Sequence, residues 1–258
     1  MSILRHPVYV WQFPVRFFHW LNAVAITVLF MTGMYIGHPI FLSPGEAVQN
    51  FSMGSMRYGH GIAAFVFIGN LLFRLYWFWA GNEYSKLRFW HKNFWQEILV
   101  SCKHYLFITR EYTVKAGHNA LAQLMYLIFI WISGTFMILT GFAMRGGGDP
   151  NGLVQVLFGW VVPTFQGEYQ VRNLHHLIAW GYAIFLLSHL YMVLRQDLLD
   201  NNGTISSMVN GYKFMILRTD ELEEEKQEPG EQVTTTGKIM KLLFKSLFKR
   251  IIQLRMRR

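Results

Sequence analysis

Cysteine is almost absent from this sequence. Cys102 is the single cysteine in 258 residues, so the chain cannot form an intrachain disulfide or ligate an iron–sulfur cluster through its own thiolates. It also lacks a Cys-x-x-Cys-His motif, which excludes a covalently attached c-type haem. Any redox centre that this chain binds must therefore use histidine or another ligand without a thiol.

Charged side chains are scarce as well. They make up 15% of the sequence, whereas soluble domains carry about 25%, and 52% of the residues are hydrophobic. A membrane-spanning helix needs roughly 20 apolar residues, and four stretches are long enough: 17–37, 58–79, 121–144 and 174–194. We therefore expect an all-α membrane protein, a bundle of four transmembrane helices.

Two further features refine this expectation. No small-residue cleavage site follows the first span, so we expect that span to be retained and not removed as a signal peptide. The run 153–165 is apolar but too short to cross a bilayer, and it contains Pro163. It is typical of a helix that lies at the membrane surface.

Lysine and arginine predict the orientation, because short cytoplasmic loops are enriched in them. The N-terminal arm, the segment 80–120 and the segment 195–218 contain two, six and three such residues, eleven in all. The opposite loops contain three: Arg57, Arg145 and Arg172. Both termini are therefore expected in the cytoplasm. The net charge of +9 then reflects topology and the basic tail, and it does not indicate a nucleic-acid partner.

The C-terminal part differs from the rest. Residues 219–232 are acidic and resemble a solvated linker, whereas residues 238–258 contain eight Lys or Arg beside an apolar helical face. That face is typical of an amphipathic helix on anionic lipid; docking on a partner protein is the alternative. We expect a membrane domain over 1–218 and a separate tail over 219–258.

Five histidines lie within the predicted spans. In the predicted orientation, His19 and His189 lie near the cytoplasmic face, and His60 and His175 lie near the opposite face. Fourteen residues separate His175 from His189, so they are roughly 21 Å apart along the helix and within roughly 40° of the same face. His176 lies roughly 140° away from the face of His189. The pattern favours two histidine pairs at two depths, with His176 in neither.

Two imidazoles that face each other across a helical bundle are the ligands of a bis-histidine haem b. Zinc is a competing interpretation, although it prefers four ligands. Helix-packing or proton-relay histidines in a haem-free anchor or transporter are another. An Arg-x-x-His pattern occurs three times and favours haem, because arginine binds carboxylates such as the haem propionates; anchoring of span ends is the alternative. The three pairs are Arg16 with His19, Arg57 with His60 and Arg172 with His175.

Two long segments resemble a known family. RFFHWLNAVAITVLFMTG (16–33) and RNLHHLIAWGYAIFLLSH (172–189) are similar to signatures of the b-type cytochrome subunit of membrane-bound nickel–iron hydrogenases. GHNALAQ (117–123) and ISSMVNGYK (205–213) also look familial. The resemblance covers roughly residues 8–215, with Asn173 where a smaller residue is usual, and the tail departs from it.

This resemblance implies an electron-transfer subunit of the bacterial inner membrane. Such a subunit anchors the iron–sulfur small subunit and the nickel–iron large subunit at the periplasmic face, and it passes electrons through two haem b groups to quinone. Carried over to this sequence, the outer haem falls on His60 and His175 and the inner haem on His19 and His189, which agrees with the pairing inferred from depth and helical phase. His176 occupies a position that is not a ligand.

The quinone site is less well defined by the sequence. His118 precedes the third span on the cytoplasmic side and can offer a hydrogen bond or a proton to a quinone oxygen; a solvent-facing loop histidine is the alternative. Without thiolates for a nickel–iron centre, the chain alone is not expected to activate hydrogen. A cytochrome b subunit of formate dehydrogenase or thiosulfate reductase remains an alternative function.

Overall fold

A computed structural model describes residues 5–39, 51–87, 92–110, 112 and 114–216. Residues Pro7–Met215 form one compact unit. A second unit comprises Met1–His6 and Ile216–Arg258, of which Arg5, His6 and Ile216 are described. The predicted acidic linker and basic amphipathic helix over 219–258 lie outside the described residues, so the division at 218 stays a prediction.

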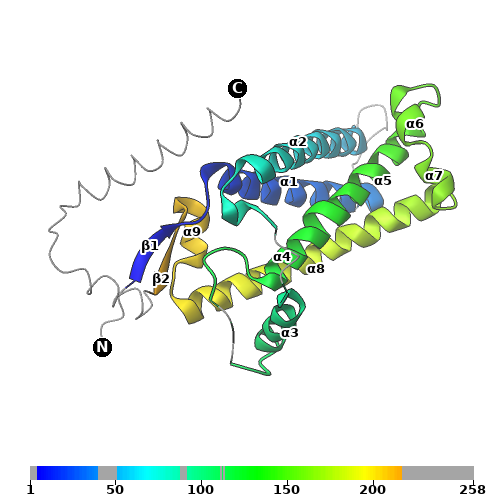
Figure 1. The fold of residues 1–258 in the computed structure, drawn as a ribbon. Helices are drawn as coiled ribbons and strands as arrows, with labels where there is room; N and C mark the ends of the chain where they lie inside the picture. The colour runs from blue at the N-terminus through cyan, green and yellow to red at the C-terminus, as the bar shows by residue number, and fades with distance from the viewer. Residues whose placement is uncertain (1–4, 40–50, 88–91, 111, 113, 217–258) are drawn as a thin grey trace, which may run out of the picture. The chain divides into compact units, whose positions relative to one another are not determined.

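Four helices of the described chain are long and apolar enough to cross a membrane, which confirms the predicted all-α, four-span fold (Figure 1). Each is longer than the apolar stretch that predicted it. They are α1 (Phe13–Gly37), α2 (Ser52–Ala80), the composite span Ala120–Gly146 and α8 (Glu168–Asp200).

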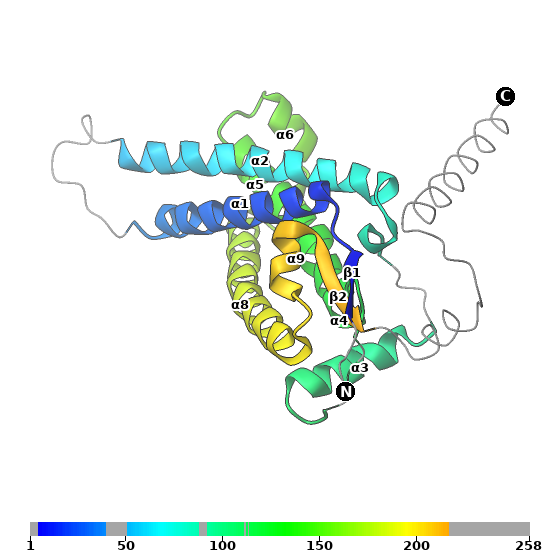
Figure 2. The same ribbon diagram turned by 90° about the vertical axis from the view of Figure 1, so that its left-hand side faces the viewer.

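The spans pack as two antiparallel pairs. Helix α1 lies against α2, and α5 (Gly134–Gly146) lies against α8; Figure 2 shows both pairs from a second side. Large apolar side chains remain exposed along α8, including Leu177 and Leu187, each 70% exposed. Such exposure over a whole helix is unfavourable in water and suits contact with lipid.

The composite third span changes its helical geometry midway. It begins as α4 (Ala120–Tyr126), where the Asn119 side chain caps the helix by accepting from the Ala122 amide at 2.8 Å. A π-helical segment follows over Leu127–Ser133, and α5 completes the span. A π segment shifts the backbone pairing, and the Tyr182 hydroxyl on α8 donates to the Phe129 carbonyl within it.

We expect Tyr182→Phe to lower the free energy of unfolding by about 1–2 kcal/mol, because it leaves this buried carbonyl without its donor. Tyr182 is 6% exposed. Tyr191→Phe is the matched control, since the Tyr191 hydroxyl also donates to a carbonyl, that of Tyr105, but from a side chain 40% exposed. Thermal unfolding in detergent should show a smaller loss of stability for the control. Equal losses would contradict a larger contribution from the hydrogen bond between Tyr182 and the Phe129 carbonyl.

Short elements lie at the two ends of the spans. The predicted surface helix over 153–165 is present as two shorter helices, α6 (Leu153–Phe158) and α7 (Val161–Thr164). At the other end of α8 (Figure 1), α9 (Thr204–Asn210) follows a left-handed turn at Asn201 and Gly203. The remaining short elements are η2 (Glu83–Ser85) and α3 (Phe94–Tyr105).

No strand is predicted from the sequence, yet the structure has a small sheet. Strand β1 (Arg5–Tyr9) pairs with β2 (Tyr212–Ile216). The sheet joins segments about two hundred residues apart in the chain, and each strand is too short to stand out beside the long apolar spans. Gly211 links α9 to β2 and has a φ of 92°. Its carbonyl accepts from the Val10 amide at 2.9 Å, just after the end of β1.

Candidate functional site

Four histidines of the spans form two facing pairs. The ring centres of His19 on α1 and His189 on α8 are 6.2 Å apart, and those of His60 on α2 and His175 on α8 are 6.5 Å apart. This is the pairing expected from depth and helical phase. Helix α8 contributes one ring to each pair, and the two pairs are referred to below as the inner pair (His19, His189) and the outer pair (His60, His175).

The separations suit a metal between the rings. An imidazole nitrogen binds a transition metal at about 2 Å. Two such bonds plus the depth of each ring place the two ring centres about 6 Å apart, close to both observed values. In the part of the chain that the structure describes, His, Cys, Asp and Glu side chains form no cluster of three or more that could hold a metal ion. Two axial ligands and a macrocycle therefore fit each pair better than a tetrahedral zinc site.

His176 takes no part in either pair. It points toward the end of α1, where its Nε2 atom lies 2.8 Å from the position that a Cβ atom would occupy on Gly37. A larger residue at position 37 would therefore require the His176 ring to move. One residue further along α8 than His175, this ring is therefore directed to a different helix, as the helical phase indicates.

The three predicted arginines differ in their surroundings. Arg57 and Arg172 are exposed, near the outer pair in sequence. Arg16 uses Nη1 to donate to the Val209 carbonyl, and the neighbouring Trp20 donates to the Met208 carbonyl at 2.9 Å. Both contacts attach α9 to α1. The Arg16 Nε atom is buried and has no hydrogen-bond partner among the described residues, so it is available to a carboxylate.

Arg74 is a buried cation near the inner pair. It is 4% exposed, and its guanidinium carbon lies 5.8 Å from the centre of the Phe18 ring, next to His19 in the chain. Its Nη2 donates to the Ser85 carbonyl at 2.8 Å. Nε and Nη1 have no partner within the described chain. Because buried donors are normally paired, these atoms fit a carboxylate such as a haem propionate.

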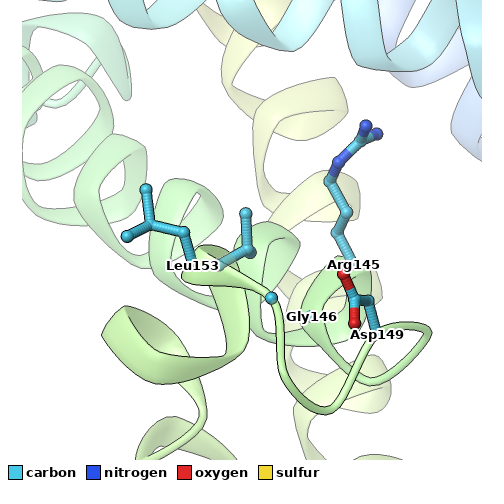
Figure 3. Close-up of a pocket in the computed structure, with 6 residues that line it drawn as sticks. Arg145, Gly146, Asp149 and Leu153 are labelled. Carbon is cyan, nitrogen blue, oxygen red and sulfur yellow. The ribbon is translucent and has the colours of Figure 1, made fainter.

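Arg145 lies beside the outer pair, as Arg74 lies beside the inner pair. From the sequence alone it was only one of the charged loop residues. Figure 3 shows its side chain extending from the end of α5, away from Leu153 and the neighbouring loop. Its Nη1 atom lies 3.7 Å from the position of a Cβ atom on Gly61, directly after His60. The sequence does contain a hint of this role: Arg145 is one of only three basic residues in the loops predicted to face away from the cytoplasm, where basic residues are disfavoured.

His118 is partly buried and packs against aromatic rings. Its ring centre lies 4.7 Å from that of Trp11 and 6.2 Å from that of Tyr126, against which it stacks. Burial, together with the smaller effect of the positive charges of Lys213 and Arg74, lowers its pKa to about 3. His118 is therefore a neutral imidazole at physiological pH, able to donate a hydrogen bond but not present as an imidazolium.

These features define a class: a four-span membrane protein with two facing pairs of histidine rings at two levels of its bundle. Residues 10–211 match the model of the prokaryotic cytochrome b561 family, and the chain belongs to this family. As a b-type cytochrome it binds haem b. This assignment sets aside the haem-free anchor or transporter and makes the protein a multi-pass membrane protein.

Several relatives are similar over most of their length. A protein of Cupriavidus necator, named "Probable Ni/Fe-hydrogenase B-type cytochrome subunit", is 40% identical over 210 residues, 80% of this chain and 86% of the relative. A protein of Azotobacter vinelandii with the same name is 36% identical, over 80% of this chain and 88% of the relative. The "Probable Ni/Fe-hydrogenase 1 B-type cytochrome subunit" of Escherichia coli K12 is 36% identical, over 82% and 92%.

Proposed function

We propose that this chain is the membrane subunit of a nickel–iron hydrogenase in the bacterial inner membrane. It connects the iron–sulfur subunit of the enzyme, on the periplasmic face, with quinone in the membrane. The observation that carries the proposal is the presence of facing histidine pairs at both ends of α8. A single pair would serve one face, whereas two pairs on one helix serve both.

Each pair holds one haem b in this proposal. A bound haem b supplies one-electron redox chemistry. The imidazoles of His60 and His175 hold and orient the outer group, and those of His19 and His189 hold the inner one. The fourteen-residue interval between the two ligands on α8 sets a spacing of roughly 21 Å between the two levels. The apolar helices around them exclude water from both sites.

Arginines neutralise the propionates in this proposal. Arg16 and Arg74 serve the inner group, since both have buried donor atoms without a partner in the described residues. Arg57 and Arg172 serve the outer group, together with Arg145, which approaches Gly61. A guanidinium matches a carboxylate with two parallel hydrogen bonds, so these residues fix the orientation of each macrocycle as well as its charge.

Quinone binds beside His118 in this proposal. The neutral ring donates a hydrogen bond to a quinone oxygen, and the proton for quinone reduction comes from the cytoplasmic side by another route. His118→Leu is expected to lower kcat/KM for quinone reduction about tenfold, the effect of about one hydrogen bond in a buried site, and to leave the haem content unchanged. His176→Ala is the control.

The pKa of His118 adds a second test. Because that pKa is about 3, the residue does not titrate between about pH 5 and pH 8, where an unperturbed histidine would. The pH profiles of wild type and His118→Leu should therefore be parallel over this range. A titration step present in wild type and lost in the variant would contradict the neutral-donor role, and unchanged kcat/KM would exclude His118 from the quinone site.

Purification of the intact membrane complex tests the function as a whole. We expect two haem b per chain, reduction of both by hydrogen, and co-purification with a nickel-containing subunit. A molybdenum- or tungsten-containing partner would instead favour formate dehydrogenase or thiosulfate reductase. The names of the relatives favour the hydrogenase. One haem per chain would refute the two-site arrangement.

A further inference from the structure

Each ring of the outer pair faces a Thr-Gly dipeptide on another helix. The Thr32 hydroxyl on α1 lies 2.9 Å from Nδ1 of His60, and the Thr140 hydroxyl on α5 lies 2.8 Å from Nδ1 of His175. The glycine that follows each threonine lies beside the same ring. A Cβ atom on Gly33 would lie 3.4 Å from Cε1 of His60, and one on Gly141 would lie 3.6 Å from Cε1 of His175.

The direction of these hydrogen bonds follows from the number of hydrogens. Each threonine hydroxyl has one hydrogen. Thr32 lies 2.6 Å from the Val28 carbonyl, and Thr140 lies 2.6 Å from the Phe136 carbonyl, one turn earlier in each helix. Donation to that carbonyl leaves the hydroxyl only lone pairs for the histidine, so the ring nitrogen Nδ1 donates.

This arrangement selects one tautomer of each ring. A neutral imidazole with its hydrogen on Nδ1 has its lone pair on Nε2, the nitrogen that is then free to bind a metal. Thr140 is fully buried, with 0% exposure, so water does not compete for this bond. The two threonines therefore hold His60 and His175 in the protonation state and orientation of a ligand.

The inner pair differs. Nδ1 of His19 is buried and has no hydrogen-bond partner in the described part of the chain. A hydrogen bond from Nδ1 makes an imidazole a more basic ligand, so His60 and His175 are expected to be stronger ligands than His19.

We propose that Thr32 and Thr140 are positioning residues for the outer haem: they accept Nδ1–H of His60 and His175, fix the ligand tautomer, and favour the ferric form of the bound iron. This inference rests on the proposed function, which assigns a haem to that pair. The consequence is a lower reduction potential of the outer haem than its histidines alone would give, and so an easier transfer of electrons from the outer level to the inner one.

Redox titration of the full-length chain in membranes, followed by the b-type α-band, tests this inference. Thr32→Val and Thr140→Val retain the shape of the side chain and remove the acceptor. Each is expected to shift the potential of the outer haem in the positive direction, by about 59 mV for every tenfold loss of preference for the ferric form. Haem affinity is expected to fall about tenfold or more. Thr32→Ser and Thr140→Ser should restore both properties.

The two helices also supply matched controls. Thr27 on α1 and Thr135 on α5 bond the carbonyl one turn earlier, at 2.8 Å and 2.6 Å, and no hydrogen bond joins either to an outer ligand among the described residues. Thr27→Val and Thr135→Val should leave the potential unchanged. The same titration in a His189→Ala background, in which only the outer haem is expected, shows which part of the α-band signal belongs to the outer haem.

The possible results distinguish a failure of the proposed function from a failure of the inference about the two threonines. If the wild-type chain shows no b-type spectrum, the proposed function fails. If it binds haem but Thr32→Val and Thr140→Val titrate like wild type, this inference alone fails. A shift of equal size in Thr27→Val or Thr135→Val would also refute it, because the effect would then belong to helix distortion and not to the ligand contact.

Discussion

His175→Ala is expected to remove the outer haem and to leave the inner one in place. His175 supplies one of the two facing rings of the outer pair, and the neighbouring His176 cannot replace it, because its ring points to Gly37. His189→Ala should have the complementary result. A haem-to-protein ratio near one in each single variant, and loss of b-type absorbance in the double variant, is the expected measurement.

His176→Ala is the adjacent control for this prediction. It changes the same amino-acid type one residue away on α8 but removes no ring from either facing pair. Both haems should remain bound, and only the packing against Gly37 should loosen. If His176→Ala lost a haem and His175→Ala did not, the assignment of the outer ligand would be wrong.

Arg74→Met is expected to weaken retention of the inner haem by about tenfold or more, a typical effect of losing a contact that supports a metal ligand set. The substitution removes a buried cation with two donor atoms that lack partners among the described residues. It also removes the hydrogen bond to the Ser85 carbonyl, which should lower the free energy of unfolding by about 1–3 kcal/mol. Arg74→Lys should retain the charge and part of the affinity.

The outer haem is the internal reference for this experiment. General unfolding would release both haems, whereas loss of a propionate contact would release the inner one first. Equal loss of both haems in Arg74→Met would contradict a specific role of Arg74.

Some parts of the site were readable from local patterns. The spans followed from apolar length, since roughly 20 residues are needed to cross a bilayer. The facing pairs followed from the interval between His175 and His189, because helical rise and phase are fixed by backbone geometry.

Other parts depended on contacts between distant segments. The burial of His118 results from Trp11, which is over one hundred residues away in the chain, so a loop position in sequence did not reveal it. Nothing in the local sequence distinguishes Thr32 and Thr140 from other residues of the spans. Their role depends on the packing of α1 against His60 and of α5 against His175. The small sheet also arises from pairing between distant segments, β1 and β2.

The sequence by itself thus determined the membrane class, the four spans, the two levels of histidine and the exclusion of thiolate chemistry. These depend on composition and on the regular geometry of one helix. Only the tertiary structure decided which arginines carry unpaired buried donors, which threonines face the outer ligands, and that His118 is neutral. Those properties depend on desolvation and hydrogen bonding between helices, which exist only after the two helix pairs have packed together.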